Sequence, residues 1–200
     1  MRWLRWFVVV VLLFSIVPFA AAQDLTETFV SADETYTVAY PEGFDVSEED
    51  AVTTIVGRLG REAIVISIAS PDVVTQLVAE TSGRRLDTKL ENILTDLGYE
   101  ISESDVVEFG DGELAYALIA PTADDLQGAG YLKPLSDGES FGLMIALNDR
   151  EEFSEDAQSI IGAMLSSYDL FDASGSSGGG TEQGDGELPA SLRDFDGRAE

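Results

Sequence analysis

The sequence predicts an α+β domain in which helices pack on the faces of an antiparallel sheet. Two Asp-Gly pairs, at residues 111–112 and 137–138, each lie between β-rich runs. Aspartate followed by glycine tolerates the positive φ that tight hairpins require. Three segments with helical spacing of apolar residues interrupt or follow these runs. The order β-rich, helical, β-rich, helical is typical of helices packed on an antiparallel sheet.

The first strands are predicted between residues 36 and 70. Residues 36–40 read Tyr-Thr-Val-Ala-Tyr and alternate aromatic or β-branched residues with smaller ones. A Pro-Glu-Gly turn then precedes a short strand at 44–46. Two further β-rich runs cover 51–56 and 62–70, and the Gly-Arg-Leu-Gly-Arg segment between them is predicted to be a hairpin loop.

The later strands are predicted on either side of the two Asp-Gly pairs. The first pair joins strands at 106–109 and 113–119, and the second joins strands at 131–135 and 140–147. Both connections are expected to be antiparallel hairpins.

The first two predicted helices follow one another. The first begins after Ser70, with Pro71 at its first position and Asp72 in its first turn. The second covers residues 84–97, and Gly98 follows it at the C′ position. We expect this second helix to make the main helical contribution to the core. Its apolar stripe consists of Leu86, Leu90, Ile93, Leu94 and Leu97.

The third predicted helix begins after Ser154, whose hydroxyl is expected to cap it, with two acidic residues in its first turn. Its apolar stripe consists of Ala157, Ile160, Ile161, Met164, Leu165 and Tyr168. The helix is therefore expected to cover one face of the sheet.

The first 22 residues have the layout of a secretory signal peptide. Arg2 and Arg5 precede an apolar run at 6–17, and three alanines at 20–22 provide the small residues that a signal peptidase requires. Cleavage is expected before Gln23, so we expect a secreted or otherwise extracytoplasmic protein with no transmembrane segment after processing. An uncleaved membrane anchor is the alternative, but the apolar run is short for a membrane span.

Composition divides the rest of the chain into two regions. Residues 23–172 have regular apolar periodicity and are predicted to form the α+β domain. Residues 173–200 are rich in Gly, Ser and acidic residues and have no periodic apolar face, so a disordered acidic tail is expected. A chain that ends at Asp172 is therefore expected to melt like the longer one.

The residue composition excludes several classes of site. The chain has 38 acidic and 11 basic residues, a formal net charge of -27, and neither His nor Cys. Without these two residue types, Ser-His-Asp and Cys-His nucleophilic sites, thiolate or imidazole zinc sites and disulfides are excluded. The hydrophobic fraction of 44% is sufficient for a core, so a largely disordered chain is also excluded.

Calcium binding and hydrolysis remain possible, because both chemistries use carboxylates alone. The local calcium candidates are Asp194 and Asp196 near the C-terminus, and Asp111 and Glu113 at the first Asp-Gly pair. Neither pair completes an EF-hand loop. A glycosidase would need two carboxylates at a fixed separation, and in so acidic a chain adjacent acids do not identify them.

The few basic residues are expected to pair with neighbouring carboxylates. They cluster lightly at Arg58 and Arg61, and again at Arg84, Arg85 and Lys89. Nucleic acid is a poor partner for this chain, because its phosphates would be repelled by the acidic surface.

Residues 36–44, which read Tyr-Thr-Val-Ala-Tyr-Pro-Glu-Gly-Phe, resemble a segment of the PsbP-like proteins. The resemblance extends over the order of elements from Phe29 to Leu170, and the last helix closes with Ser-Ser-Tyr at 166–168. It implies an exported or lumenal domain with an antiparallel sheet sandwiched between helices, a fold shared with a Ran-binding nucleocytoplasmic factor. Phe44 stands where the family usually has Trp, and the His residues that some plant members use around metal are absent, so no ligand site is transferred.

The resemblance implies a non-catalytic domain. With the composition, it predicts an exported accessory or protein-binding module with a highly acidic surface, whose partner is another protein and which needs no cofactor. A calcium-binding structural protein is the first alternative, and a carboxylate-dependent hydrolase is the second.

Overall fold

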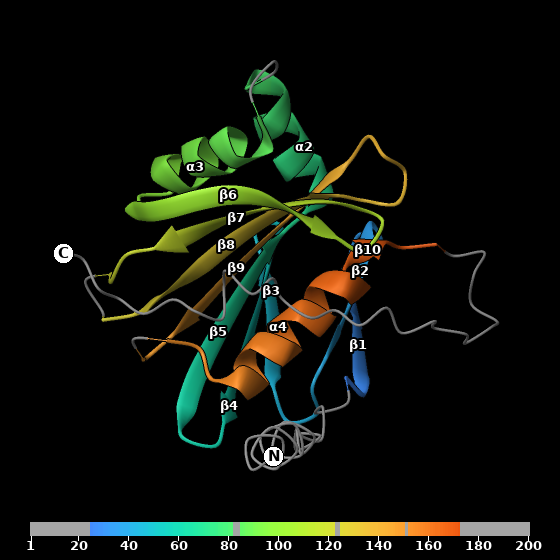
Figure 1. The fold of residues 1–200 in the computed structure, drawn as a ribbon. Coiled ribbons are helices and arrows are strands. Elements are labelled where there is room, and N and C mark those ends of the chain that lie inside the picture. Colours follow the sequence, from blue (N-terminus) through green and yellow to red (C-terminus); the bar gives the residue numbers. More distant parts are fainter. Residues whose placement is uncertain (1–24, 82–84, 123–124, 151, 173–200) are drawn as a thin grey trace, which may run out of the picture.

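The computed structural model describes residues 25–81, 85–122, 125–150 and 152–172 and forms an α+β fold (Figure 1). A seven-stranded antiparallel sheet has the strand order β3-β4-β5-β9-β8-β7-β6, and a three-stranded sheet has the order β1-β2-β10. Three helices accompany these sheets in the described residues. The predicted fold class is therefore confirmed. The predicted signal peptide and the predicted tail lie outside the described residues.

The element boundaries are as follows. The large sheet contains β3 (Asp45–Glu49), β4 (Val52–Leu59), β5 (Glu62–Ala69), β6 (Ile101–Phe109), β7 (Gly112–Ile119), β8 (Gln127–Pro134) and β9 (Phe141–Asn148). The small sheet contains β1 (Glu27–Val30), β2 (Tyr36–Tyr40) and β10 (Asp169–Leu170). The helices are α2 (Pro71–Glu80), α3 (Leu86–Asp96) and α4 (Glu155–Ser167).

The large sheet lies between two apolar layers. On one face, α4 and the small sheet pack against alternate residues of the strands, such as Ile55, Ile66 and Met144. On the other face, α2 and α3 pack against the residues in between, such as Ala117 and Ile145. This alternation follows from the strand geometry, in which successive side chains point to opposite faces.

Buried tyrosines connect the small sheet to the large one. The hydroxyl of Tyr36 on β2 forms a hydrogen bond with the Thr53 hydroxyl at 2.6 Å. Its ring packs edge-on against Tyr168, whose hydroxyl donates to the Ala69 carbonyl at 2.9 Å. Burial raises the pKa of both tyrosines, so both stay neutral at physiological pH. The first residue of the segment that resembles PsbP-like proteins therefore has a structural role.

Two predicted turns differ from the observed ones. The predicted loop at 57–61 is wrong, because β4 continues to Leu59 and only residues 60–61 form the turn. Gly57 lies inside the strand and the Phe44 ring lies over it, so that a Cβ at this position would come within 2.3 Å of that ring. In the first Asp-Gly hairpin the positive φ of 58° belongs to Gly110, while Gly112 pairs with Phe109 in the ladder.

The second Asp-Gly pair forms the expected hairpin between β8 and β9. Gly138 has a φ of 71°, and the Asp137 carboxylate accepts hydrogen bonds from the backbone N–H groups of Glu139 and Ser140. The hydrogen bond from the Ser140 hydroxyl, together with these backbone bonds, lowers the pKa of Asp137. The side chain therefore organises the turn.

The residues predicted to begin or end a helix are confirmed in α4 and α3. Ser154 caps α4 as predicted, since its hydroxyl accepts from the Ala157 N–H at 3.3 Å, and Gly98 follows α3 with a φ of 90°. Pro71 opens α2 as predicted, but the Ser70 side chain forms no capping hydrogen bond. The Ser70 N–H instead donates to the Ala51 carbonyl at 2.8 Å, which holds the start of α2 beside β4.

Two expectations about α3 are wrong. Leu97 follows the last residue of the helix and is 56% exposed, so it does not extend the buried stripe. α3 buries Leu90, Ile93 and Leu94, whereas α4 buries six residues and packs in the larger core cluster. α4 therefore makes the main helical contribution to the core.

Candidate functional site

Part of the large sheet is left uncovered on the side that carries α2 and α3. α3 lies over β6, β7 and β8, and the main sheet contact of α2 is with β9. Beyond β9, the side chains of β3, β4 and β5 that point to this side have no described helix above them. Val52 is 38% exposed and Val56 is 42% exposed. We call this surface the open face and define it by Val52, Thr54, Val56, Val65 and Ser67.

The strand register places the open face on the same side as α2 and α3. Val56 pairs with Asp45 on β3 and with Val65 on β5, and Val65 pairs with Leu147 on β9. Directly paired residues of an antiparallel sheet point to the same face. Leu147 belongs to the core cluster beneath the helices, so the valines are the exposed continuation of that core.

The α2 helix borders the open face and turns an apolar side toward it. The Thr75 hydroxyl on α2 accepts a hydrogen bond from the Phe141 N–H at the start of β9, where β9 pairs with β8. At 100° per residue, Val73 and Leu77 lie on the opposite side of the helix from Thr75. They therefore point away from β8 and toward the side of β5 and β4, and they are 43% and 36% exposed.

Charged residues lie at the two ends of the open face. Arg58 and Arg61 are at the β4–β5 turn, while Glu49 at the end of β3, Asp50 in the next turn and Asp72 in α2 are at the opposite end. None of these five side chains forms an ion pair with another described residue. The predicted pairing of Arg58 and Arg61 with neighbouring carboxylates is therefore wrong within the described part of the chain. Charges of both signs border the open face, because exposed Asp45 on β3 lies directly opposite Val56, near the arginines.

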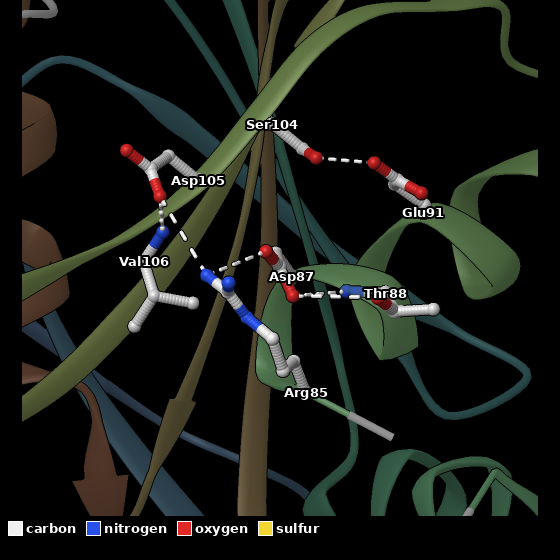
Figure 2. A network of polar contacts seen from close by, with 7 residues as sticks. All are labelled: Arg85, Asp87, Thr88, Glu91, Ser104, Asp105 and Val106. Carbon is white, nitrogen blue, oxygen red and sulfur yellow. Dashed lines mark hydrogen bonds and ion pairs between the residues drawn. The ribbon is translucent and has the colours of Figure 1, made fainter.

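In the second basic cluster, Arg85 and Lys89 contact other residues of the domain. Arg85 lies 3.0 Å from the Asp87 carboxylate and 3.9 Å from that of Asp105 on β6, as Figure 2 shows. Its side chain is 71% exposed, so these pairs contribute little stability. Lys89 forms no ion pair with a described residue, and its Nζ lies 5.5 Å from the centre of the Phe141 ring. Arg84 lies outside the described residues.

A hollow next to this network lies between α3 and β6. It is lined by Glu91, Thr95, Tyr99 and residues 100–103. Glu91 already accepts a hydrogen bond from the Ser104 hydroxyl (Figure 2). In the described part of the chain, no three acidic side chains come together in a way that could hold a metal ion, and this includes the glutamates of the hollow.

A buried carboxylate, Glu62, is the feature of the described residues that most resembles a catalytic group. It is 1% exposed and accepts hydrogen bonds from the Asn148 amide at 2.8 Å and from the Ser154 hydroxyl at 2.5 Å. The Ser154 N–H also points at both carboxylate oxygens, at 3.4 Å. Its hydrogen bonds hold the N-terminus of α4 on the sheet.

The opposite end of α4 is held by a half-buried lysine. The Lys133 ammonium group on β8 donates to the Leu165 carbonyl at 2.8 Å, in the last turn of the helix, where a cation is favourable. Burial lowers the pKa of Lys133, and the nearby Asp169 carboxylate partly offsets this effect. No feature of the sequence pointed to Glu62 or Lys133, because each depends on a partner about 30 residues or more away.

Two of the four predicted calcium candidates lie in the described residues. Asp111 is exposed in the β6–β7 turn, and Glu113 is exposed on β7 directly opposite Glu108. Asp194 and Asp196 lie outside the described residues. The described helices include none that is long and apolar enough to cross a membrane.

Several solved structures are similar to this chain. The yeast (Saccharomyces cerevisiae) Ran-binding protein Mog1p is 11% identical, with 73% of this chain and 95% of that chain covered and a TM-score of 0.48. A substituted form of Mog1 is 12% identical, with 74% and 97% covered and a TM-score of 0.45. The PsbP protein CyanoP from Synechocystis sp. PCC 6803 is 10% identical, with 72% and 92% covered and a TM-score of 0.43.

The sequence itself matches no family model and no curated protein.

Proposed function

We propose that this chain is an exported, non-catalytic protein-binding module that binds its partner through the open face. The observation that carries the proposal is the pair of exposed valines, Val52 and Val56, on sheet strands that no described helix covers. On the same face of the sheet, the apolar residues of β6 to β9 are covered by α2 and α3. An apolar surface with a polar rim is typical of protein interaction sites.

The chemistry of the described residues supports binding over catalysis. The buried carboxylate of Glu62 is occupied by hydrogen bonds that fix α4, and the carboxylates around the open face are dispersed along its edges. Binding through a rigid sheet face needs none of the nucleophiles or metal ligands that the composition excludes. It requires apolar area and a charge pattern, and the open face has both.

Site-specific photo-crosslinking tests this function. A photoreactive amino acid at Val56 should crosslink a partner protein in the native extracytoplasmic fraction, and the same group at Leu97 should not. Leu97 is a matched control because it is also an exposed apolar residue, but it follows α3, which lies over β6, β7 and β8 and not over the strands of the open face. Equal crosslinking from both positions, or none from Val56, would reject the open face as the binding surface.

A further inference from the structure

We propose that the C-terminal segment of this chain, residues 188–195, docks on the open face as a short helix beside α2. The segment then competes with the partner protein for this surface, so the inference rests on the function proposed above and adds how the surface is regulated. The open face has exposed apolar side chains that no described helix covers. The C-terminal segment has the apolar side chains that would cover them.

The C-terminal segment has the residue spacing of one apolar helix face. Leu188, Leu192 and Phe195 follow one another at i, i+4 and i+7, which places them on one side of a helix. Pro189 is suited to the first helical position, and Gly197 to a position after the last turn. A helix this short is marginal in water unless its apolar side is buried. The segment therefore folds only on an apolar surface.

The open face has room for one helix beside α2. In the sheet order, β4 lies two strands from β9, the strand that α2 contacts (Figure 1). Neighbouring strands lie about 4.8 Å apart, so a helix over β4 is about 10 Å from α2. Packed helices are usually separated by about 8–10 Å. The apolar side of such a helix contacts Val52 and Val56 on the sheet, and Val73 and Leu77 on α2.

The described chain ends close to the open face. The Phe171 N–H donates to the Thr35 carbonyl at 3.0 Å, and in the same turn the Ala32 N–H donates to the Glu48 carboxylate at 3.0 Å. Glu48 belongs to β3, the edge strand of the open face. About 15 residues rich in Gly and Ser separate Asp172 from the C-terminal segment, and a linker of this composition has an average length of about 20 Å. The segment therefore reaches around the edge of β3 onto the open face.

Tethering favours this segment over a free molecule of similar chemistry. A short flexible linker gives an effective concentration in the millimolar range. A segment whose dissociation constant is about 0.1 mM when free is then docked in about nine molecules of ten, and the apparent affinity of a competing partner falls about tenfold. Docking also stabilises the folded domain, so a chain that ends at Asp172 should melt below the exported chain, in place of the equal melting expected from composition.

Disulfide formation between introduced cysteines tests the docking, because the chain has no native cysteine. Thr54→Cys on the open face and Ser191→Cys beside the apolar side of the segment keep all the apolar side chains. In a glutathione buffer, the fraction of intramolecular disulfide gives the effective concentration of the segment at the open face. At about 0.5 M NaCl, which screens the repulsion between acidic surfaces, this value should be at least about tenfold higher than for Leu97→Cys with Ser191→Cys.

Substitutions in the segment provide a control with the same linker. Leu188→Ser with Phe195→Ser removes two apolar side chains, so the effective concentration at Thr54 should fall at least about tenfold. Ala190→Ser changes the opposite side of the helix and should leave this concentration unchanged. Equal effective concentrations at Thr54 and Leu97 overturn the proposal, as does a value at Thr54 that the double substitution leaves unchanged. Circular dichroism of each variant verifies that it is folded.

Photo-crosslinking from Val56 separates the docking from the function proposed above. Leu188→Ser with Phe195→Ser should increase crosslinking to the partner protein about tenfold at low partner concentration, because the open face is no longer occupied. If crosslinking to the partner is the same with and without these substitutions, regulation by the segment is rejected and the protein-binding function stands. If the disulfide at Thr54 forms as expected but Val56 crosslinks no other protein in either form, the docking stands and the protein-binding function is rejected.

Discussion

Glu62 completes the N-terminus of α4 from a distant strand. In a capping box, the residue at the third helical position is usually a Glu or Gln that reaches back to the N–H of the capping residue. In α4 that position is Ala157, and Glu62 on β5 accepts from the Ser154 N–H and hydroxyl in its place. The same interaction therefore caps the helix and attaches it to the sheet.

Glu62→Gln should lower the free energy of unfolding by about 1–3 kcal/mol, because the new amide group presents a donor where the carboxylate accepts two hydrogen bonds in a buried site. Urea unfolding measures the change. Glu113→Gln is the control, since Glu113 is exposed, and it should shift the value by less than about 0.5 kcal/mol. Equal effects of the two substitutions would show that Glu62 is not essential to the docking of α4.

Gly57→Ala should destabilise the domain by about 1–3 kcal/mol, because the new methyl group overlaps the Phe44 ring. Gly112→Ala is the matched control: Gly112 is also a strand glycine, and nothing lies within 4 Å of a Cβ there. Thermal melting compares the two variants. When Phe44 is already replaced by Ala, the substitution Gly57→Ala should lower the melting temperature clearly less than it does in the wild-type protein. If the Gly57→Ala and Gly112→Ala proteins have the same melting temperature, the Phe44 ring moves aside without cost and the prediction is wrong.

At the scale of elements, α3 is held to the sheet through a close contact with β8. Leu90 and Leu94 are fully buried, and the Leu94 side chain occupies the space above Gly130, where a Cβ would come within 2.7 Å of it. The glycine and the leucine are therefore complementary in shape. The stripe predicted from helical spacing is confirmed for these residues and fails at Leu97, where the helix has already ended.

Leu90→Ala or Leu94→Ala should each lower the free energy of unfolding by about 2–5 kcal/mol, because each leaves a cavity under α3. Leu97→Ala removes the same atoms from an exposed site and should cost less than about 0.5 kcal/mol. Denaturant unfolding of the three variants tests this order. A loss below about 0.5 kcal/mol at both buried positions would contradict the packing of α3.

At the scale of the whole molecule, the excess of carboxylates should make stability depend on salt. Both edge strands of the large sheet, β3 and β6, carry several acidic residues, and such charges at sheet edges discourage pairing with other chains. Added salt screens the repulsion between the carboxylates of one chain, because the screening length falls from about 10 Å at 0.1 M salt to about 3 Å at 1 M.

The melting temperature of the exported chain should therefore rise with monovalent salt, and NaCl and KCl should act alike. A parallel series in CaCl₂ at constant ionic strength separates screening from a specific calcium site, which would saturate at low calcium concentration. A melting temperature that is flat up to molar NaCl would reject the repulsion argument. A sharp response to millimolar calcium would instead favour the calcium-binding alternative.

Much of the fold follows from local patterns. The alternation in β2, the turn at Asp137-Gly138 and the cap at Ser154 each depend on neighbours a few residues away, and all three are confirmed. β1 and β10 are short and gain their partners from β2, so their own residues do not predict them. Gly57 lies inside β4 under the ring of Phe44, a contact between residues 13 apart that the local pattern at 57–61 does not record.

The sequence by itself determined the α+β class, the hairpins, the helix stripes, the acidity and the absence of His and Cys chemistry, because composition and short-range periodicity carry this information. The tertiary structure decided which strands the helices cover. The residues of β4 point alternately to the two faces of the sheet, and their sequence does not record whether a helix covers one of these faces. Val52 and Val56 are exposed because no described helix extends beyond β9 to cover them. The open face is thus a consequence of long-range packing, which no local pattern records.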